Sequence, residues 1–445
     1  MMKLKKILSL GLAAAMALSL TACGGGSSSG SSSKTGGSAS SSAGGEAVEI
    51  SLWTYPIGSW GGTESKLDDI IATFNKVHPE IKVTYETLDY TNGDNQVTSA
   101  ITAKGTPDII MEGPERLVSN WGANNLMVDL SDLWADTKDD IAAVSEAVVN
   151  ACQLDGKFYE YPLCMTAHCM AINYEVFEQA DALKYLDLEN RTWTTQDFVK
   201  AMEAVRDSGL TAVPGIVYCG GQGGDQGTRA LVNNLFSGKY TNAEHTEYTV
   251  NSTENVQGLE LIKAMVDSKA LNANASFQAT EELQQFANGT SAVSFCWNAS
   301  SKAQYASQVN FTPYAMAFPT NDGQPELCGG IWGFGVFNNG DEAKIEAAKT
   351  FIKFICDDPS QAAESVRLTG FFPTRASLGD VYESTEQAEQ MGEFASLMPY
   401  LGDYYNVTGN WTAQRQNWFN MLQEILIKGT PAQQAADTFV QASNP

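Results

Sequence analysis

Strands and helices alternate between residues 48 and 111 of this chain, and no other feature constrains the fold as strongly. Residues 48–53 alternate between apolar and polar side chains, which predicts a half-buried strand. Residues 65–78 carry apolar side chains at helical spacing, and Pro79 ends that helix. The order continues with a strand at 81–88, a helix at 96–104 and a strand at 107–111. Such alternation predicts a parallel sheet covered by helices, which binds ligands beyond the carboxyl ends of its strands.

Length, charge and cysteine content narrow the class of protein. The 445 residues are enough for two domains with cores of their own, and no apolar run after the N-terminal one reaches membrane-spanning length. The formal net charge of −25 would repel nucleic acid, so we expect no nucleic-acid partner. Eight cysteines without regular spacing argue against a disulfide framework, and three histidines disfavour a histidine-based metal centre. We therefore expect neither a metal nor a cofactor.

The N-terminal residues indicate the cellular localisation of the protein. Lysines precede a short apolar stretch at 7–20, as in a secretory signal, and Leu20-Thr21-Ala22-Cys23 resembles a bacterial lipobox. We expect residues 1–22 to be a lipoprotein signal peptide, with lipid on Cys23 and a flexible Gly- and Ser-rich tether at 23–45. This predicts a protein anchored through lipid at the extracellular face of the bacterial cytoplasmic membrane. The alternative is an ordinary secretory signal with a coincidental cysteine.

Several short motifs occur in order along nearly the whole body. They are His78-Pro79-Glu80-Ile81, Gly105-Thr106-Pro107-Asp108-Ile109, Asp155-Gly156-Lys157-Phe158-Tyr159, Asn173-Tyr174, Thr192-Trp193-Thr194, the segment 286–293 and Gly370-Phe371-Phe372-Pro373-Thr374-Arg375. Together they resemble the extracellular solute-binding proteins of bacterial ABC importers, in the group that binds carbohydrates and glycerol-3-phosphate. Asn173-Tyr174 stands in inverted order relative to the family's pattern.

The resemblance implies an α/β, two-lobed fold of the periplasmic-binding-protein type (type II). Each lobe would be a mostly parallel sheet flanked by helices, and hinge strands would join the lobes. We place the N-terminal lobe at 46–165 and 331–380 and the C-terminal lobe at 166–330 and 381–445. A ligand would close the cleft between the lobes, and the closed form would dock on the permease subunits of the importer. We expect a monomer.

A sugar has an apolar ring face and a rim of hydroxyls, which aromatic and polar side chains bind respectively. The aromatic candidates lie at predicted strand ends, crossings and loops: Trp53, Tyr55, Trp60, Trp297, Trp332 and Trp411. The polar candidates in similar places are Glu112, Tyr218, Asp225, Asn298, Arg375 and Arg415. The resemblance puts stacking tryptophans near Trp297 and Trp411. For any single tryptophan, burial in a core is the competing interpretation.

These features favour a binding protein over an enzyme. Outside the tether, the sequence lacks the nucleophile-elbow, phosphate-loop and zinc-protease motifs. A neutral mono- or oligosaccharide is the favoured ligand. The alternative is a polyol phosphate such as glycerol-3-phosphate, with Arg375 or Arg415 as anion partner. A surface adhesin and a carbohydrate-active enzyme with paired carboxylates are further alternatives.

Overall fold

The computed structural model describes residues 47–444, apart from 62–64, 91, 222–223 and 403–410. The predicted signal peptide (1–22) and the predicted tether (23–45) with Cys23 lie outside the described residues. The strands are β1 (Val48–Thr54), β2 (Ile81–Thr87), β3 (Ile109–Glu112), β4 (Gln153–Leu154), β5 (Lys157–Phe158), β6 (Tyr161–Asn173), β7 (Ile216–Tyr218), β8 (Asn272–Asn274), β9 (Val293–Trp297), β10 (Pro313–Met316), β11 (Cys328–Val336) and β12 (Phe372–Pro373).

Helices connect and cover these strands. Those before β7 are α1 (Leu67–Val77), α2 (Gly93–Ala103), α3 (Pro114–Arg116), η1 (Leu117–Gly122), α4 (Ser131–Trp134), α5 (Lys138–Ala142), α6 (Glu146–Ala151), α7 (Tyr174–Gln179), η2 (Leu183–Tyr185) and α8 (Thr195–Ser208). Those after β7 are α9 (Asp225–Leu235), α10 (Thr253–Asp267), α11 (Ala279–Ala287), α12 (Ala299–Tyr305), α13 (Glu342–Asp357), α14 (Ala362–Thr369), η3 (Ala376–Leu378), α15 (Ala388–Ala395), η4 (Met398–Tyr400), α16 (Trp411–Gln423), η5 (Glu424–Lys428) and α17 (Ala432–Ser443).

The parallel sheet predicted at the start of the body is confirmed. β1 pairs in parallel with β2 on one side and with β3 on the other. Leu52 in β1 and Ile109 in β3 are fully buried, as the apolar positions of the pattern require. α2 begins at Gly93, earlier than the sequence indicated, and β3 includes Glu112 as its last residue.

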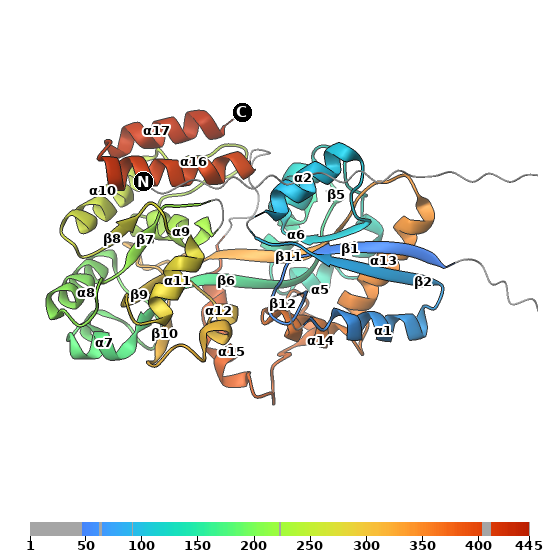
Figure 1. Cartoon of the computed structure of the whole chain (residues 1–445), viewed down its shortest axis with the longest axis horizontal. Helices are drawn as coiled ribbons and strands as arrows, with labels where there is room; N and C mark the ends of the chain where they lie inside the picture. The colour runs from blue at the N-terminus through green and yellow to red at the C-terminus, as the bar shows by residue number, and fades with distance from the viewer. Residues whose placement is uncertain (1–46, 62–64, 91, 222–223, 403–410, 445) are drawn as a thin grey trace, which may run out of the picture. The chain divides into compact units, whose positions relative to one another are not determined.

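Two long strands, β6 and β11, run antiparallel to each other and carry the sheet across the body (Figure 1). β11 also pairs antiparallel with β3, while the later part of β6 pairs antiparallel with β9 and β10. The main sheet therefore has the order β10-β6-β11-β3-β1-β2 and is mixed. Parallel pairing holds for β1, β2 and β3, and again for β7 and β8. Both long strands are antiparallel to the strands that pair with them.

Elements gather around two parts of these long strands (Figure 1). We call the first set the β1 group: it contains β1, β2 and β3, α2, which connects β2 to β3, and α1, α13 and α14, which pack on or beside this part of the sheet. We call the second set the β9 group: it contains β7 to β10, with α9 and α11 packed on β9, and α10, α16 and α17 packed on α9 and on one another. β6 and β11 belong to both sets.

Local sequence signals explain where α8 begins and how closely β6 and β11 approach each other. Thr194 caps α8, because its side chain accepts a hydrogen bond from the backbone N–H of Asp197 at 3.0 Å. Gly333 stands at an irregularity in the β6–β11 ladder, where a Cβ would lie 2.6 Å from the Tyr161 carbonyl oxygen. The glycine at this position therefore allows the two backbones to approach closely.

The described cysteines behave as small apolar side chains. All seven are buried and free. Within the described part of the chain, no helix has the length and apolar character that a membrane crossing needs.

Candidate ligand-binding site

Aromatic rings meet beyond the carboxyl ends of β1 and β2. Tyr55 follows β1 and Tyr90 follows β2, and their rings stack with centroids 5.1 Å apart and planes 17° apart. Trp332, on β11, meets Tyr55 edge-on at 6.0 Å. Tyr55 is 3% exposed, whereas Tyr90 is 58% exposed. We call these three residues the aromatic cluster, in which Tyr90 offers a ring to solvent above a buried partner.

The buried tyrosine of this cluster is fixed by its surroundings. A Cβ on Gly93, the first residue of α2, would lie 2.6 Å from the Tyr55 hydroxyl oxygen, so a larger residue at this position would require the tyrosine ring to shift. Burial raises the pKa of Tyr55, and the nearby Glu112 carboxylate raises it further. The Tyr90 hydroxyl donates a hydrogen bond to the Pro56 carbonyl oxygen at 3.2 Å, which orients the exposed ring.

Charged side chains at the end of β3 lie next to this cluster. Arg116 binds the Asp94 carboxylate through two bonds, Nε to Oδ1 at 2.6 Å and Nη2 to Oδ2 at 2.8 Å. Its Nη1 lies 3.0 Å from Glu112 Oε1. Burial alone would raise the pKa of Asp94, but Arg116 and Arg415 lower it below its ordinary value. Asp94 is therefore held in its charged form.

A second set of charges comes from α9 and α16. Arg415 Nε lies 3.1 Å from Asp225 Oδ1, and Asp225 Oδ2 lies 2.8 Å from Arg229 Nε. Arg415 Nη1 also reaches Asp94 Oδ2 at 3.4 Å. These contacts join both sets of charges. We call the six residues the ionic network: Glu112, Arg116, Asp94, Arg415, Asp225 and Arg229.

Glu112 has an unusual titration for a carboxyl group. Its side chain is 3% exposed, and burial raises its pKa to about 7, although Arg116 opposes the rise. Glu112 Oε2 accepts a hydrogen bond from the Gly113 N–H at 2.6 Å. Glu160 lies nearby and is fully buried, with neither carboxyl oxygen hydrogen-bonded among the described residues. Burial raises the pKa of Glu160, and the Glu115 and Glu112 carboxylates add to the rise.

Several of the predicted site residues belong to these two assemblies. Tyr55 and Trp332 lie in the aromatic cluster, and Glu112, Asp225 and Arg415 lie in the ionic network. Trp53 lies within β1 rather than after it, and it is partly buried against the core.

Other predicted aromatic residues are buried elsewhere. Trp60 is fully buried, donates from Nε1 to Thr54 Oγ1 at 2.9 Å and packs on Phe334 at 5.9 Å between ring centroids. Trp297 is fully buried too, at the end of β9, with Phe286 edge-on at 5.2 Å. A fully buried ring has no face free for a ligand, so in this conformation neither residue offers a stacking platform. Burial in the core, the competing interpretation for a single tryptophan, describes Trp60 and Trp297 in this structure.

Two of the predicted polar residues have local structural contacts. Tyr218 is fully buried, and its hydroxyl donates a hydrogen bond to the Gly224 carbonyl oxygen. Asn298 caps α12, where its Oδ1 accepts from the Ser301 N–H at 2.8 Å. Its Nδ2 also lies 3.3 Å from Nδ1 of His168, whose pKa burial lowers to about 4.

Two predicted residues remain, Arg375 and Trp411. Arg375 is 3% exposed and already binds Asp357 Oδ1 through Nε at 2.9 Å and the Pro162 carbonyl oxygen through Nη1 at 2.6 Å. The structure therefore does not favour Arg375 as an anion partner for a ligand. Trp411 begins α16, and its side chain lies outside what the structure describes.

Sequence reasoning missed four residues of the aromatic cluster and the ionic network: Tyr90, Asp94, Arg116 and Arg229. The rule that ligands bind beyond strand ends was applied to the first and third strands, but not to the second, after which Tyr90 and Asp94 follow. Arg116 lies just after the third strand, and its charge beside Glu112 was the available signal.

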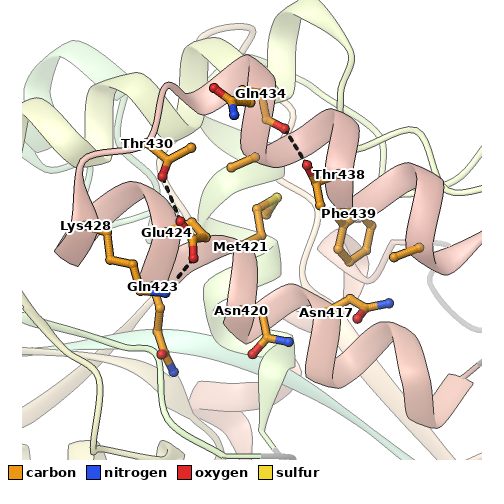
Figure 2. A pocket seen from close by; sticks show the side chains of 12 residues that line it. Asn417, Asn420, Met421, Gln423, Glu424, Lys428, Thr430, Gln434, Thr438 and Phe439 are labelled. Atoms are coloured by element: carbon orange, nitrogen blue, oxygen red, sulfur yellow. Dashed lines mark hydrogen bonds and ion pairs between the residues drawn. The ribbon is translucent and has the colours of Figure 1, made fainter.

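A separate groove lies between α16 and α17, with η5 at one end (Figure 2). Its volume is about 400 Å³, and amide and hydroxyl side chains line it together with Met421 and Phe439. Glu424 at its edge binds both Lys428 and Thr430, at 2.6 Å and 2.8 Å. The groove contains none of the predicted site residues, and its charged groups bind each other.

The fold and this cluster of side chains beyond strand ends are typical of a protein that binds small molecules. The chain belongs to the bacterial extracellular solute-binding proteins, because the model of that family matches residues 69–394. This is a family of binding proteins. None of the curated proteins matches the chain.

Solved structures share the fold. The GacH receptor of Streptomyces glaucescens, described unliganded and with acarbose, is 17% identical with a TM-score of 0.70, over 89% of this chain and 97% of that one. The Listeria monocytogenes protein Lmo0181, in complex with cycloalternan, is 20% identical with a TM-score of 0.70, over 89% and 98%. A Thermotoga lettingae solute-binding protein bound to α-D-tagatose is 15% identical with a TM-score of 0.71, over 89% and 99%. The predicted α/β fold of the periplasmic-binding-protein type is confirmed.

Proposed function

We propose that this protein is the substrate-binding component of an ABC importer and captures a sugar or oligosaccharide over the aromatic cluster. The observation that carries the proposal is the exposed Tyr90 ring, stacked on buried Tyr55 beside the ionic network. An aromatic ring binds the apolar face of a sugar, and carboxylates and guanidinium groups hydrogen-bond its hydroxyls. Acarbose, cycloalternan and tagatose, bound by the similar structures, belong to the same chemical class.

The charges of the site support a neutral ligand. Arg116 shares Glu112 and Asp94, and Arg415 shares Asp94 and Asp225, so each guanidinium is balanced by carboxylates. A phosphate ester bound here would face those carboxylates and pay for their repulsion. A neutral sugar can instead use both kinds of group as donors and acceptors without adding charge.

The proposed mechanism is closure of two lobes on the sugar. The lobe boundaries remain 46–165 with 331–380, and 166–330 with 381–445. The change of partners along β6, from β11 and β12 to β9 and β10, supports a crossing within this strand. Ser377 in η3 binds Asp140 of α5, and α15 packs on α12, which supports a last crossing near residue 380. The closed protein would then deliver its sugar to the permease.

Anchoring completes the proposal. A lipid on Cys23 and the Gly- and Ser-rich tether would hold the binding protein beside its permease on the outer face of the cytoplasmic membrane. Replacing Cys23 by alanine should move the protein from the membrane fraction to the soluble fraction. Unchanged membrane retention of that variant would contradict lipid anchoring.

A thermal-shift screen of the purified protein tests the proposed ligand class. A ligand present at 100 times its dissociation constant adds about 2.7 kcal/mol to the free energy of unfolding, which raises the melting temperature measurably. Maltotriose, tagatose, other neutral sugars and glycerol-3-phosphate would be compared. We expect a rise with one class of neutral sugar. A rise with glycerol-3-phosphate alone would overturn the proposal in favour of a polyol phosphate.

A further inference from the structure

Arg415 connects the two groups of elements that flank the long strands. It lies on α16 of the β9 group, and its Nε lies 3.1 Å from Asp225 Oδ1 at the start of α9 in the same group. Its Nη1 reaches in the other direction, to Asp94 Oδ2 at 3.4 Å on α2 of the β1 group. One guanidinium thus binds a carboxylate from each group.

Each of those carboxylates is also held by a second arginine. Asp94 binds Arg116 through two bonds at 2.6 and 2.8 Å, and Asp225 lies 2.8 Å from Arg229. When Arg415 leaves Asp94, both carboxylates keep an arginine partner. Separation of the groups therefore avoids the large penalty of leaving a buried charge without a counter-charge.

The contact between the groups is also the longest of these ion pairs, and it is more exposed than the pair that Asp225 forms with Arg229. The side chains of Arg415 and Asp94 are 11% and 24% exposed, whereas those of Asp225 and Arg229 are 0% and 1% exposed. Water and salt reach the first pair more easily than the second. The network should therefore break between Arg415 and Asp94 and stay intact between Asp225 and Arg229.

We propose that Arg415 is a positioning residue that holds the two groups of elements together across the ligand site, and that the site opens when Arg415 releases Asp94 while remaining on Asp225. The proposal rests on the proposed function in placing the ligand between the groups. Its consequence is that the ligand-free protein already populates the closed form, so a sugar has less closure free energy to supply.

The first test needs no ligand. Small-angle X-ray scattering gives the radius of gyration of the purified protein at about 20 mM and about 500 mM NaCl, which shortens the Debye length several-fold. We expect the radius of the wild type to increase with salt. Arg415→Gln and Asp94→Asn should have the larger radius already at low salt and lose the salt response, while Arg415→Lys, which keeps the charge, should retain part of it.

Circular dichroism shows whether each variant is folded, and a matched control variant shows the effect of losing an arginine elsewhere. Arg206 pairs with Asp207 within α8, so Arg206→Gln should behave like the wild type. If Arg415→Gln does not fold, Asp94→Asn and the salt response of the wild type still decide the question. Equal radii in all of these proteins at both salt concentrations would overturn the proposal.

The second test measures affinity, with maltotriose, tagatose and glycerol-3-phosphate as probes in a calorimeter. Loss of the ion pair between Arg415 and Asp94 should weaken sugar binding about 5- to 50-fold, mainly through faster dissociation. The double variant, Asp94→Asn with Arg415→Gln, should bind the sugar no more weakly than the weaker-binding single variant does. Additive losses with unchanged radii would mean that Arg415 contacts the ligand instead, and would overturn the positioning role. If the wild type binds none of the sugars, the proposed function fails, while the scattering result still decides the role of Arg415.

Discussion

Glu112 shows how a single residue links the strand end to the chemistry of the site. It is the last residue of β3, is 3% exposed and contacts Arg116 at 3.0 Å. Burial raises its pKa to about 7 despite the neighbouring guanidinium. A carboxyl group whose pKa is raised on folding takes up a proton when the protein folds at intermediate pH. Its contribution to stability is therefore present at low pH and lost as the pH rises.

This gives a prediction for Glu112→Gln. Stability of the wild type relative to the variant should be greatest below about pH 4.5 and should fall by about 2–3 kcal/mol as the pH rises through about 7, from the rise in pKa. Urea unfolding of both proteins at pH 5 and pH 8 measures the difference. Glu260→Gln, at an exposed position on α10, should show no such change. A rise in the stability of the wild type relative to Glu112→Gln between pH 5 and pH 8 would contradict the account.

The site residues divide into those that local pattern reveals and those that tertiary packing decides. Tyr55 follows a strand that the alternation of apolar and polar residues predicts, and Glu112 follows the strand predicted at 107–111. Trp60 lies close to Tyr55 in the sequence, but Ile57 and Trp60 bridge each other and turn its ring into the core. Periodicity cannot distinguish these two outcomes, because the direction of a loop side chain depends on contacts distant in sequence.

At the scale of elements, β11 shows how close packing restricts a backbone. It pairs with β6 and with β3, and its ladder with β6 shifts register between Trp332 and Gly333. The backbones approach so closely here that a Cβ on Gly333 would lie 2.6 Å from the Tyr161 carbonyl oxygen and 2.7 Å from Pro162 Cα. Trp332, a member of the aromatic cluster, depends on this irregularity for its position.

Gly333→Ala should therefore destabilise the protein, because the added methyl group meets backbone atoms that cannot move aside cheaply. We expect a loss of about 1–3 kcal/mol in the free energy of unfolding, measured by urea denaturation. Gly392 is the matched control: it lies within α15, and a Cβ there meets nothing within 4 Å. Gly392→Ala should be neutral or stabilising by up to about 1 kcal/mol. Equal effects of the two substitutions would contradict the explanation.

Much of the element order follows from sequence, and the antiparallel crossings do not. The parallel strands β1, β2 and β3, the cap of α8 at Thr194 and the long helix α13 follow local rules of period and capping. The antiparallel pairing of β6 with β11, β9 and β10 brings together residues far apart along the chain. No local pattern in residues 161–173 says which strands will lie beside them.

At the scale of the whole molecule, the long strands allow one continuous sheet to support two groups of helices. Side chains on β3 and β11 and in the segments that follow β1, β2 and β3 form the aromatic cluster and one half of the ionic network, while α9 and α16 supply the other half. A ligand that contacts both halves favours their approach only through its extra affinity for the closed arrangement. Capture of a neutral sugar by the exposed ring between these halves is the central claim.

The most direct test is calorimetric titration of the wild type, Tyr90→Ala and Tyr90→Phe with the neutral sugar that gives the largest thermal shift. The account predicts saturable binding to the wild type and a loss of about 1–2 kcal/mol, or about 5- to 30-fold in affinity, in Tyr90→Ala, because the stacking ring is gone. Tyr90→Phe keeps the ring and should bind nearly as well as the wild type. Equal affinity of Tyr90→Ala and the wild type would contradict the claim.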